Sequence, residues 1–259
     1  MKYLLPILFL FIFSCDNDDN DCILDCAGAC NENVELWGEC YNIEETTQLW
    51  IINGMATGTI PAAIGDLTNL TWLTISNNPN LGGNIPEEIG NLTNLTSLAM
   101  DQNELIGEIP IELFNLTNLI YLSFDENQIS GSIPSEIGQL INLTDFWASS
   151  NELSGDIPSE IGQLINLTDL YLPHNNLTGI PSEISLLENL SSISISNNQF
   201  TSLPDNICDL PDGCYIWVHD NNLCEDNYYE YGCLSDWYPQ DQSNCCKGPE
   251  GQANWTTCP

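Results

Sequence analysis

The sequence contains almost no positive charge. Apart from two histidines, its only basic side chains are Lys2 and Lys247, and arginine is absent. Aspartate and glutamate together number 37, which gives a formal net charge of −35 at pH 7. A surface this negative repels phosphate backbones and anionic lipid headgroups, so we exclude nucleic acid as a partner. The same charge fits either adaptation to salty surroundings or attraction of cations and basic partners, and it does not separate the two.

Side chains suited to catalysis are also scarce. Histidine occurs only as His174 and His219, and beyond the first few residues the one amine side chain is Lys247. General acid–base catalysis and phosphoryl transfer rely on such groups. We therefore predict that the protein is not an enzyme and that it carries no cofactor.

Cysteine is missing from the whole middle of the chain. Five of the 12 cysteines lie at or before Cys40, and the other seven lie at or after Cys208. This distribution is typical of an oxidising compartment, in which disulfides close the two ends of an extended domain. The alternative, a zinc site at the N-terminal cysteines, lacks histidine partners and Cys-x-x-Cys pairs. We expect disulfides within each end and leave their pairing open.

Long hydrophobic runs are absent except at the start of the chain. The stretch from Leu4 to Phe13 is almost wholly apolar and follows the single charge of Lys2. It is too short to cross a bilayer as a helix. We predict that residues 1–14 are a signal peptide.

The residues that follow indicate a membrane anchor. Ser14-Cys15 resembles the end of a bacterial lipobox, in which the cysteine becomes lipidated, and residues 15–21 resemble the acidic tethers of bacterial surface lipoproteins. The resemblance implies a lipid anchor at Cys15 and a location at the bacterial outer surface. If Cys15 is not lipidated, all 12 cysteines can pair with one another.

The chain does contain a strong internal repeat. Leu-Thr-Asn-Leu begins at residue 116, and Leu-Ile-Asn-Leu begins at residues 140 and 164, an interval of 24 residues. A fixed period of this length predicts a solenoid in which each repeat buries its apolar side chains against its neighbours. Complete copies begin at Leu67, Leu92, Leu116, Leu140, Leu164 and Leu187, and partial copies begin near Ile43 and at Leu210.

Each position in the repeat has a physical reason. Leu-x-Leu alternates with the period of a β-strand, so successive copies are expected to stack as a parallel sheet. An asparagine column is expected to satisfy backbone groups where the chain leaves that sheet. A glycine column permits a second bend, and a proline column favours short 3₁₀ or irregular turns on the opposite side. The asparagines are Asn78, Asn103, Asn127, Asn151, Asn175, Asn198 and Asn221, and the glycines are Gly83, Gly107, Gly131, Gly155 and Gly179.

The full pattern, Leu-x-x-Leu-x-x-Leu-x-Leu-x-x-Asn-x-Leu-x-Gly-x-Ile-Pro, resembles the plant-type subclass of leucine-rich repeats found in receptor ectodomains. The resemblance implies an α/β-type solenoid, mostly β, shaped as a horseshoe with a parallel concave sheet and disulfide-rich end caps. We expect a cysteine-rich N-terminal cap at residues 22–42, repeats at 43–223 and a cysteine-rich C-terminal cap at 224–259.

The resemblance also implies that ligands bind to the concave face, through the variable positions beside the inward leucines. The rings of Tyr121, Trp147 and Tyr171 are expected on adjacent strands beside the carboxylates of Asp145 and Asp169. Clustered exposed aromatics indicate a contact site, although packing of the rings on one another is the alternative. The predicted ligand is a protein or a glycan bound by a monomer. The ligand-binding candidates are Tyr121, Asp145, Trp147, Asp169, Tyr171, His174 and Trp217.

Three weaker possibilities remain. Asp101, Asp125 and Glu126 are candidate calcium ligands. A carbohydrate-active enzyme would need Asp145 and Asp169 as its acid–base pair, but an open sheet offers no pocket that excludes water. An adhesive or ice-binding solenoid is suggested by a row of threonines that Ile120 interrupts. These threonines are Thr47, Thr71, Thr96, Thr144 and Thr168.

Overall fold

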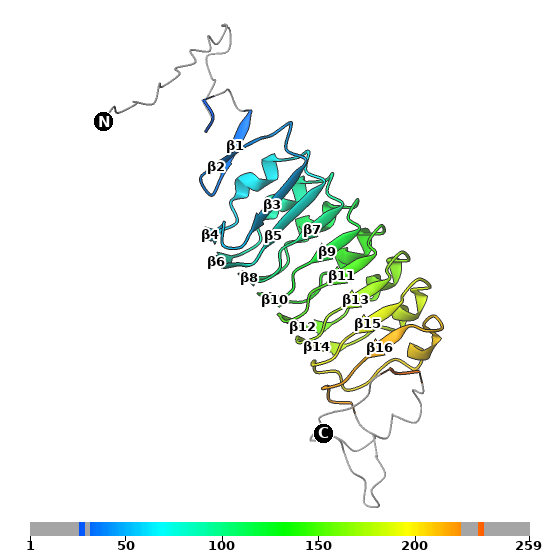
Figure 1. Ribbon diagram of the computed structural model, residues 1–259. Helices are drawn as coiled ribbons and strands as arrows, with labels where there is room; N and C mark the ends of the chain where they lie inside the picture. Colours follow the sequence, from blue (N-terminus) through cyan, green and yellow to red (C-terminus); the bar gives the residue numbers. More distant parts are fainter. Residues whose placement is uncertain (1–25, 29–31, 224–232, 236–259) are drawn as a thin grey trace, which may run out of the picture.

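A computed structural model describes residues 26–28, 32–223 and 233–235. The described chain forms an elongated solenoid of stacked repeats, with the earliest strands at one end and β16 at the other (Figure 1). The predicted signal peptide, the acidic tether with Cys15 and most of the predicted C-terminal cap lie outside the described residues.

One face of the solenoid is an eight-stranded parallel sheet in which every repeat contributes one strand next to the strand of the preceding repeat. This confirms the predicted strand at Leu-x-Leu. Leu122, Phe146 and Leu170 are register partners on successive strands and are fully buried, while their neighbours along each strand face outward. The strands are β3 (Gln48–Ile52), β5 (Trp72–Ser76), β7 (Ser97–Ala99), β9 (Tyr121–Ser123), β11 (Asp145–Trp147), β13 (Asp169–Tyr171), β15 (Ser192–Ser194) and β16 (Tyr215–Trp217).

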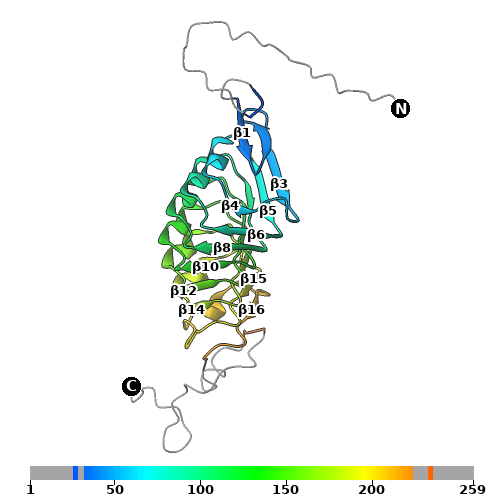
Figure 2. The same ribbon diagram turned by 90° about the vertical axis from the view of Figure 1, so that its left-hand side faces the viewer.

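A second parallel sheet of six strands forms where the sequence predicted only a bend. It lies beside the first sheet along the whole series of early and middle repeats (Figure 2). Its strands are β4 (Gly58–Thr59), β6 (Asn78–Gly83), β8 (Asn103–Gly107), β10 (Gln128–Gly131), β12 (Glu152–Asp156) and β14 (Asn176–Gly179).

The glycine column closes most of these strands in a left-handed conformation. Gly107 and Gly131, for example, have φ angles of 80° and 79°, which residues with a side chain rarely adopt. Gly179 departs from the prediction, because its φ is not positive. A Cβ atom at Gly179 would instead collide with the carboxylate of Asp156, so a larger residue here would require that side chain to move.

The remaining side of each repeat is a short 3₁₀ segment that follows the proline column, as predicted. Pro134 and Pro158 stand directly before two of these segments with extended backbone angles. Within the described residues no helix is long and apolar enough to cross a membrane. The segments are η1 (Ala62–Asp66), η2 (Glu87–Asn91), η3 (Ile111–Asn115), η4 (Ser135–Gln139), η5 (Ser159–Gln163), η6 (Ser182–Leu186) and η7 (Ile207–Asp209).

The predicted asparagine column forms a continuous internal ladder. In the middle of it, the Asn127 side chain accepts from the Leu105 N–H at 3.1 Å and donates to the carbonyls of Met100 at 2.7 Å and Phe124 at 3.0 Å. Equivalent bonds recur from Asn78 to Asn221. Each asparagine thus satisfies backbone groups of its own repeat and of the preceding one, which confirms the structural role expected of this column.

Both ends carry a disulfide, and a hairpin covers the N-terminal end. At the N-terminal end the antiparallel hairpin of β1 (Asn33–Leu36) and β2 (Glu39–Asn42) packs on the first repeat. Trp37, in its turn, donates to the Thr59 carbonyl at 3.1 Å, and Cys26 is bonded to Cys40. At the other end Cys208 is bonded to Cys233. Disulfides within each end were predicted, and these two confirm it.

Candidate ligand-binding face

The outward side of the eight-stranded sheet, which we call the open face, carries a row of aromatic rings. Tyr121, Trp147 and Tyr171 project from β9, β11 and β13, three neighbouring strands, as the sequence predicted. The ring centroids of Tyr121 and Trp147 are 5.6 Å apart at 67°, and those of Trp147 and Tyr171 are 5.8 Å apart at 48°. The rings therefore contact one another edge to face or tilted, and all three stay partly exposed.

Trp217 extends the row across β15. Its ring lies 6.0 Å from Tyr171, although the strand between them contributes only the small side chain of Ser194 at this level. Tyr215, which is 60% exposed, stacks on Trp217 at 5.7 Å and 12°. Sequence reasoning did not choose Tyr215 as a site residue.

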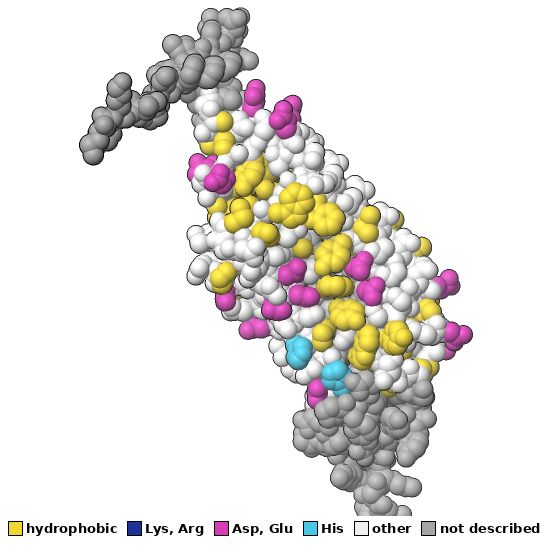
Figure 3. All heavy atoms as spheres, viewed as in Figure 1, with side chains coloured by type: hydrophobic (Ala, Val, Ile, Leu, Met, Phe, Trp, Pro, Cys, Tyr) yellow, Lys and Arg dark blue, Asp and Glu magenta, His cyan; other side chains and the backbone are white. Residues whose placement is uncertain are grey.

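Figure 3 shows the resulting stripe of hydrophobic side chains on the open face, with acidic side chains on its flanks and the two histidines near one end. Trp50 and Trp72 are also exposed on this sheet, at 49% and 43%. They belong to the first two strands, and Trp72 Nε1 donates to the Thr74 hydroxyl at 3.0 Å.

Two carboxylates lie beside the rings in fixed orientations. Asp145 and Asp169 are register partners on β11 and β13. The Thr144 hydroxyl lies 2.6 Å from Asp145 Oδ2, and the Thr168 hydroxyl lies 2.8 Å from Asp169 Oδ2. Ser192 also donates to Asp169. The predicted juxtaposition of rings and carboxylates is therefore present, and hydroxyl groups hold the acids in place.

A second acidic group lies past the other end of the strands. Asp101 accepts from the Ser123 hydroxyl and from the Asp125 N–H at 3.0 Å, and Asp125 accepts from the Ser149 N–H at 2.6 Å. Burial raises the pKa of both carboxyls above the ordinary value, and these hydrogen bonds oppose the rise. The carboxylates of Asp101 and Asp125 thus accept hydrogen bonds from backbone N–H groups of the next repeat. In the described part of the chain, no set of three or more side chains is placed to hold a metal ion.

His174 and Glu126 lie outside the aromatic row. Each occupies the position just before a ladder asparagine, where the chain turns off the sheet with φ of 56° and 54°. Asn and Asp, which tolerate this conformation well, fill the same position in several other repeats. The turn explains the place of both residues, and both side chains are exposed.

Basic partners for the acidic side chains are almost absent from the described residues. They include no lysine or arginine, and the one ion pair found among them joins His219 Nε2 to Asp220 at 3.8 Å. The carboxylates of the open face therefore have no cationic side chain beside them, and their negative potential is available to a ligand.

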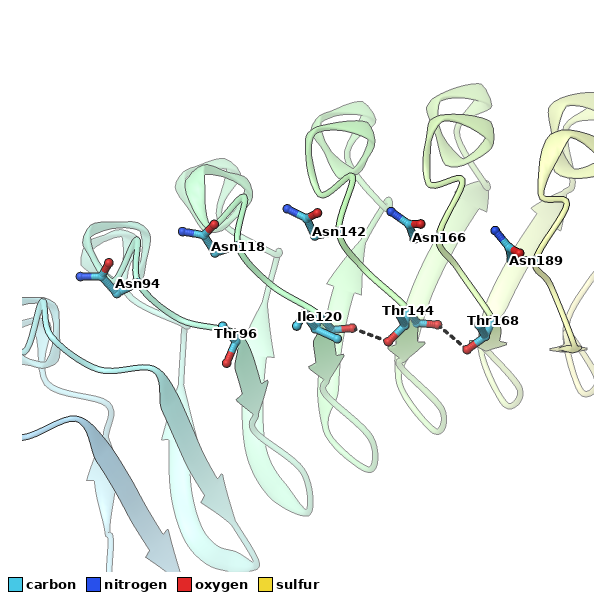
Figure 4. Close-up of a pocket in the computed structure, with 9 residues that line it drawn as sticks. All are labelled: Asn94, Thr96, Asn118, Ile120, Asn142, Thr144, Asn166, Thr168 and Asn189. Carbon is cyan, nitrogen blue, oxygen red and sulfur yellow. Dashed lines mark hydrogen bonds between the residues drawn. The ribbon is translucent and has the colours of Figure 1, made fainter.

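A groove that the sequence did not reveal runs along the edge where the strands of the open face begin. Figure 4 shows its two rails, an upper row of asparagines and a lower row of threonines with one isoleucine. Its volume is about 720 Å³, and it is lined by Asn94, Thr96, Asn118, Ile120, Asn142, Thr144, Asn166, Thr168 and Asn189. The repeated Leu-x-Asn-Leu was the available signal for this asparagine column, to which the sequence reasoning assigned no role.

Comparison with known protein families matches the repeats directly. A model described as "Leucine-rich repeat region" matches residues 56–174, and a model described as "Leucine Rich Repeat" matches residues 166–187 and 189–210. Together they match more than half of the 259 residues. The chain belongs to the leucine-rich repeat family. A comparison of this leucine-rich repeat protein with curated proteins finds no match.

Solved structures of plant proteins share the fold. The ectodomain of the receptor kinase GASSHO1/SCHENGEN3 from Arabidopsis thaliana, in complex with CASPARIAN STRIP INTEGRITY FACTOR 2, is 35% identical, with a TM-score of 0.60. The Arabidopsis receptor kinase HAESA, in complex with the peptide hormone IDA and the co-receptor SERK1, is 32% identical, with a TM-score of 0.61. The matches cover 65% of this leucine-rich repeat protein in both cases but only 23% and 28% of the receptors, about a quarter of their length.

A third similar structure is that of a plant ice-binding protein. It is 28% identical with a TM-score of 0.57, and the match covers 77% of this chain and 71% of that one.

Proposed function

We propose that this leucine-rich repeat protein is an extracellular binding module whose open face takes an extended, positively charged segment of a protein or peptide. The observation that carries the proposal is the row of Tyr121, Trp147, Tyr171 and Trp217 beside carboxylates that have no cationic neighbour. A lysine or arginine side chain can lie over an aromatic face and pair with an adjacent carboxylate at once. The described residues supply neither cation at this face.

The aromatic row is also built as an interface core. Aromatic anchors surrounded by polar groups are the usual hot spots of protein–protein interfaces. The Nε1 of Trp147 is buried and has no hydrogen-bond partner among the described residues. A buried donor without a partner costs about 1–3 kcal/mol, and a ligand carbonyl that reached this N–H would recover that cost.

The ring geometry favours a peptide over a glycan at this face. Sugars stack on flat aromatic platforms, whereas neighbouring rings from Tyr121 to Trp217 are inclined by 48–67°. The receptor GASSHO1/SCHENGEN3 and the receptor HAESA were solved with partners described as an integrity factor and a peptide hormone, which supports a peptide-type ligand.

The proposed location rests on the disulfides and on the N-terminal sequence. The Cys26–Cys40 and Cys208–Cys233 bonds are typical of proteins exported from the reducing cytosol. We propose export through residues 1–14 and lipid anchoring at Cys15 on a bacterial outer surface. Replacement of Cys15 by Ser should release the protein from the membrane fraction, and retention of the variant there would contradict the anchor.

The binding proposal is tested by selecting ligands for the full chain from a displayed library of random linear peptides. We expect the selected peptides to be rich in Lys and Arg. Trp147→Ala should weaken their binding by at least about 2 kcal/mol, roughly thirtyfold, because it removes the middle ring of the row. A double variant, Asp145→Asn with Asp169→Asn, should have a comparable effect without changing side-chain size.

The matched control is Trp50→Ala, which removes an exposed ring of the same sheet outside the row. It should leave peptide affinity nearly unchanged. Selection of peptides without cationic residues, or equal losses for Trp50→Ala and Trp147→Ala, would contradict the proposal.

Ice binding is a second candidate, favoured by the similarity to a plant ice-binding protein. The threonine row provides regularly spaced hydroxyls, although Thr71 and Thr96 each donate to a backbone carbonyl of the preceding repeat. Thermal hysteresis of the purified full chain tests this function. Freezing behaviour identical to that of an inert protein at the same concentration would rule it out.

A further inference from the structure

The groove along the edge of the open face is lined by uncharged side chains, and the carboxylates of Asp145 and Asp169 lie just outside this lining. All nine side chains that line it are asparagine, threonine or isoleucine, in a chain whose net charge is −35. Its volume of about 720 Å³ falls within the range of ordinary ligand sites, about 300–1,000 Å³. We propose that this groove is a second binding site, which holds a linear, uncharged polysaccharide with one sugar unit per repeat.

The asparagine rail is locked in one orientation. Asn118 Nδ2 donates to the Thr93 carbonyl at 2.9 Å, and Asn142 Nδ2 donates to the Thr117 carbonyl at 2.9 Å. The nitrogens in Figure 4 point toward the preceding repeat, and the oxygens point away from it. Each Oδ1 has no partner among the described residues, and each amide keeps one N–H. The rail therefore offers an acceptor and a donor at every repeat.

The threonine rail offers acceptors. Thr96 Oγ1 donates to the Thr71 carbonyl at 3.0 Å. Thr144 Oγ1 and Thr168 Oγ1 lie 3.1 and 3.0 Å from the carbonyls of the preceding repeats and also contact the carboxylates of Asp145 and Asp169, so each single proton is shared between two acceptors. Because each hydroxyl proton is already engaged, the oxygen lone pairs remain for a ligand. A sugar hydroxyl both donates and accepts, so it matches the two rails together. An ammonium group or an anion would match only part of this set.

Ile120 gives the middle of the groove an apolar floor. Its side chain is 46% exposed, where the neighbouring repeats carry Thr96 and Thr144. A sugar ring has an apolar C–H face as well as a polar edge, so one ring can pack on Ile120 while its hydroxyls reach the asparagines. The interruption of the threonine row therefore favours a glycan.

The spacing of the repeats also distinguishes between a peptide and a polysaccharide as the ligand of the groove. Adjacent strands lie about 4.7–4.9 Å apart, and an extended peptide advances only about 3.2–3.4 Å per residue. A peptide would fall out of register within two repeats. One unit of an extended polysaccharide advances by roughly the strand spacing, so equivalent hydroxyls can meet equivalent asparagines along the whole groove.

The test is calorimetric binding of linear, uncharged β-1,4-linked glucose, mannose and xylose oligosaccharides, from dimers to octamers, to the full chain. We expect affinity for at least one series to rise with length and to level off near five units, because five asparagines line the groove. An oligogalacturonate of equal length, which is anionic, should bind more weakly.

Two matched pairs of variants assign the binding to the groove. Ile120→Glu places a carboxylate in the groove and should weaken binding at least tenfold, whereas Ile111→Glu makes the same charge change at an exposed position outside it. Thr96→Val removes a rail hydroxyl, whereas Thr71→Val removes a hydroxyl with the same inter-repeat bond outside the lining. We expect only the first member of each pair to lose affinity.

Absence of binding by every oligosaccharide would overturn the proposal, as would equal losses within a pair or an affinity independent of length. The site stands apart from the proposed function of the open face. Trp147→Ala should leave oligosaccharide affinity unchanged, and Thr96→Val should leave the affinity of the selected peptides unchanged. Either proposal can therefore fail alone.

Discussion

Two columns of asparagine run along the solenoid with the same period, and they differ in burial. The inner column, represented by Asn127, lies between the two sheets and satisfies one N–H and several carbonyls. The outer column, represented by Asn118, makes one bond to the preceding repeat and faces the groove. One residue type at one spacing thus holds the fold together in the first column and leaves hydrogen-bonding groups for a ligand in the second.

Among the variants that test this difference between the two asparagine columns, Asn127→Ala in the inner column should have the largest effect on stability. This change leaves the buried Leu105 N–H without a partner and removes one bond from each of the carbonyls of Met100 and Phe124, which still accept from other ladder asparagines. At about 1–3 kcal/mol for the unsatisfied N–H and about 0.5–1.5 kcal/mol for each lost bond, we expect a loss of about 2–6 kcal/mol in the free energy of unfolding. Urea titration followed by circular dichroism measures it. A loss below about 1 kcal/mol would show that the ladder is not essential.

The outer column predicts a much smaller effect on stability. Asn118→Ala removes one exposed bond to the Thr93 carbonyl, which water can replace. We expect a loss of about 0.5–1.5 kcal/mol, the net value of a single hydrogen bond. The same titration compares it with Asn127→Ala. Equal losses at the two positions would mean that burial does not distinguish the columns.

The smallest expected effect concerns a contact of intermediate burial. Asp101 joins two repeats by accepting from the Asp125 N–H, and burial raises the pKa of its carboxyl. A carboxyl whose pKa is higher in the folded state stabilises the fold at pH values below its unfolded pKa of about 3.9 and loses that contribution as pH rises through the folded pKa. The charged form at neutral pH is therefore unfavourable.

Asp101→Asn keeps the acceptor oxygen and removes the charge. We expect the variant to match the wild type below about pH 4 and to exceed its stability at pH 7 by a few tenths to about 1 kcal/mol. Thermal unfolding at a series of pH values measures the difference. A variant that is less stable at pH 7, or a difference that does not change with pH, would contradict the assignment.

The sequence predicted the elements that depend on local patterns. Leu122 and Leu170 lie on strands of one parallel sheet, Pro134 precedes a 3₁₀ segment, and Asn127 forms the inner ladder, all as expected. Each of these features follows from the residues of a single repeat. Alternation, a fixed proline φ angle and an amide at a turn are properties that one copy displays by itself.

The features that were missed depend on contacts between repeats. The second sheet needs the backbone of one repeat to pair with the next, and Gln128 pairs with Ile106 without any distinctive side chain. The role of the outer asparagine column follows from hydrogen bonds between repeats, such as that from Asn142 Nδ2 to the Thr117 carbonyl, which only the structure shows. The rings were placed correctly on neighbouring strands, but Tyr215 joined them through stacking that a column of residues does not show.

The disulfide at the C-terminal end has a mechanical consequence. Among the described residues, the last repeat contributes β16 to the eight-stranded sheet and no strand to the six-stranded sheet. Ser235 pairs with Ile216 on the free edge of β16 and is tied to η7 by the Cys208–Cys233 bond two residues away. Tension applied to the chain beyond residue 235 is therefore carried covalently to η7, in the preceding repeat, as well as to the edge of β16. The disulfide thus opposes peeling of β16 from this end of the solenoid.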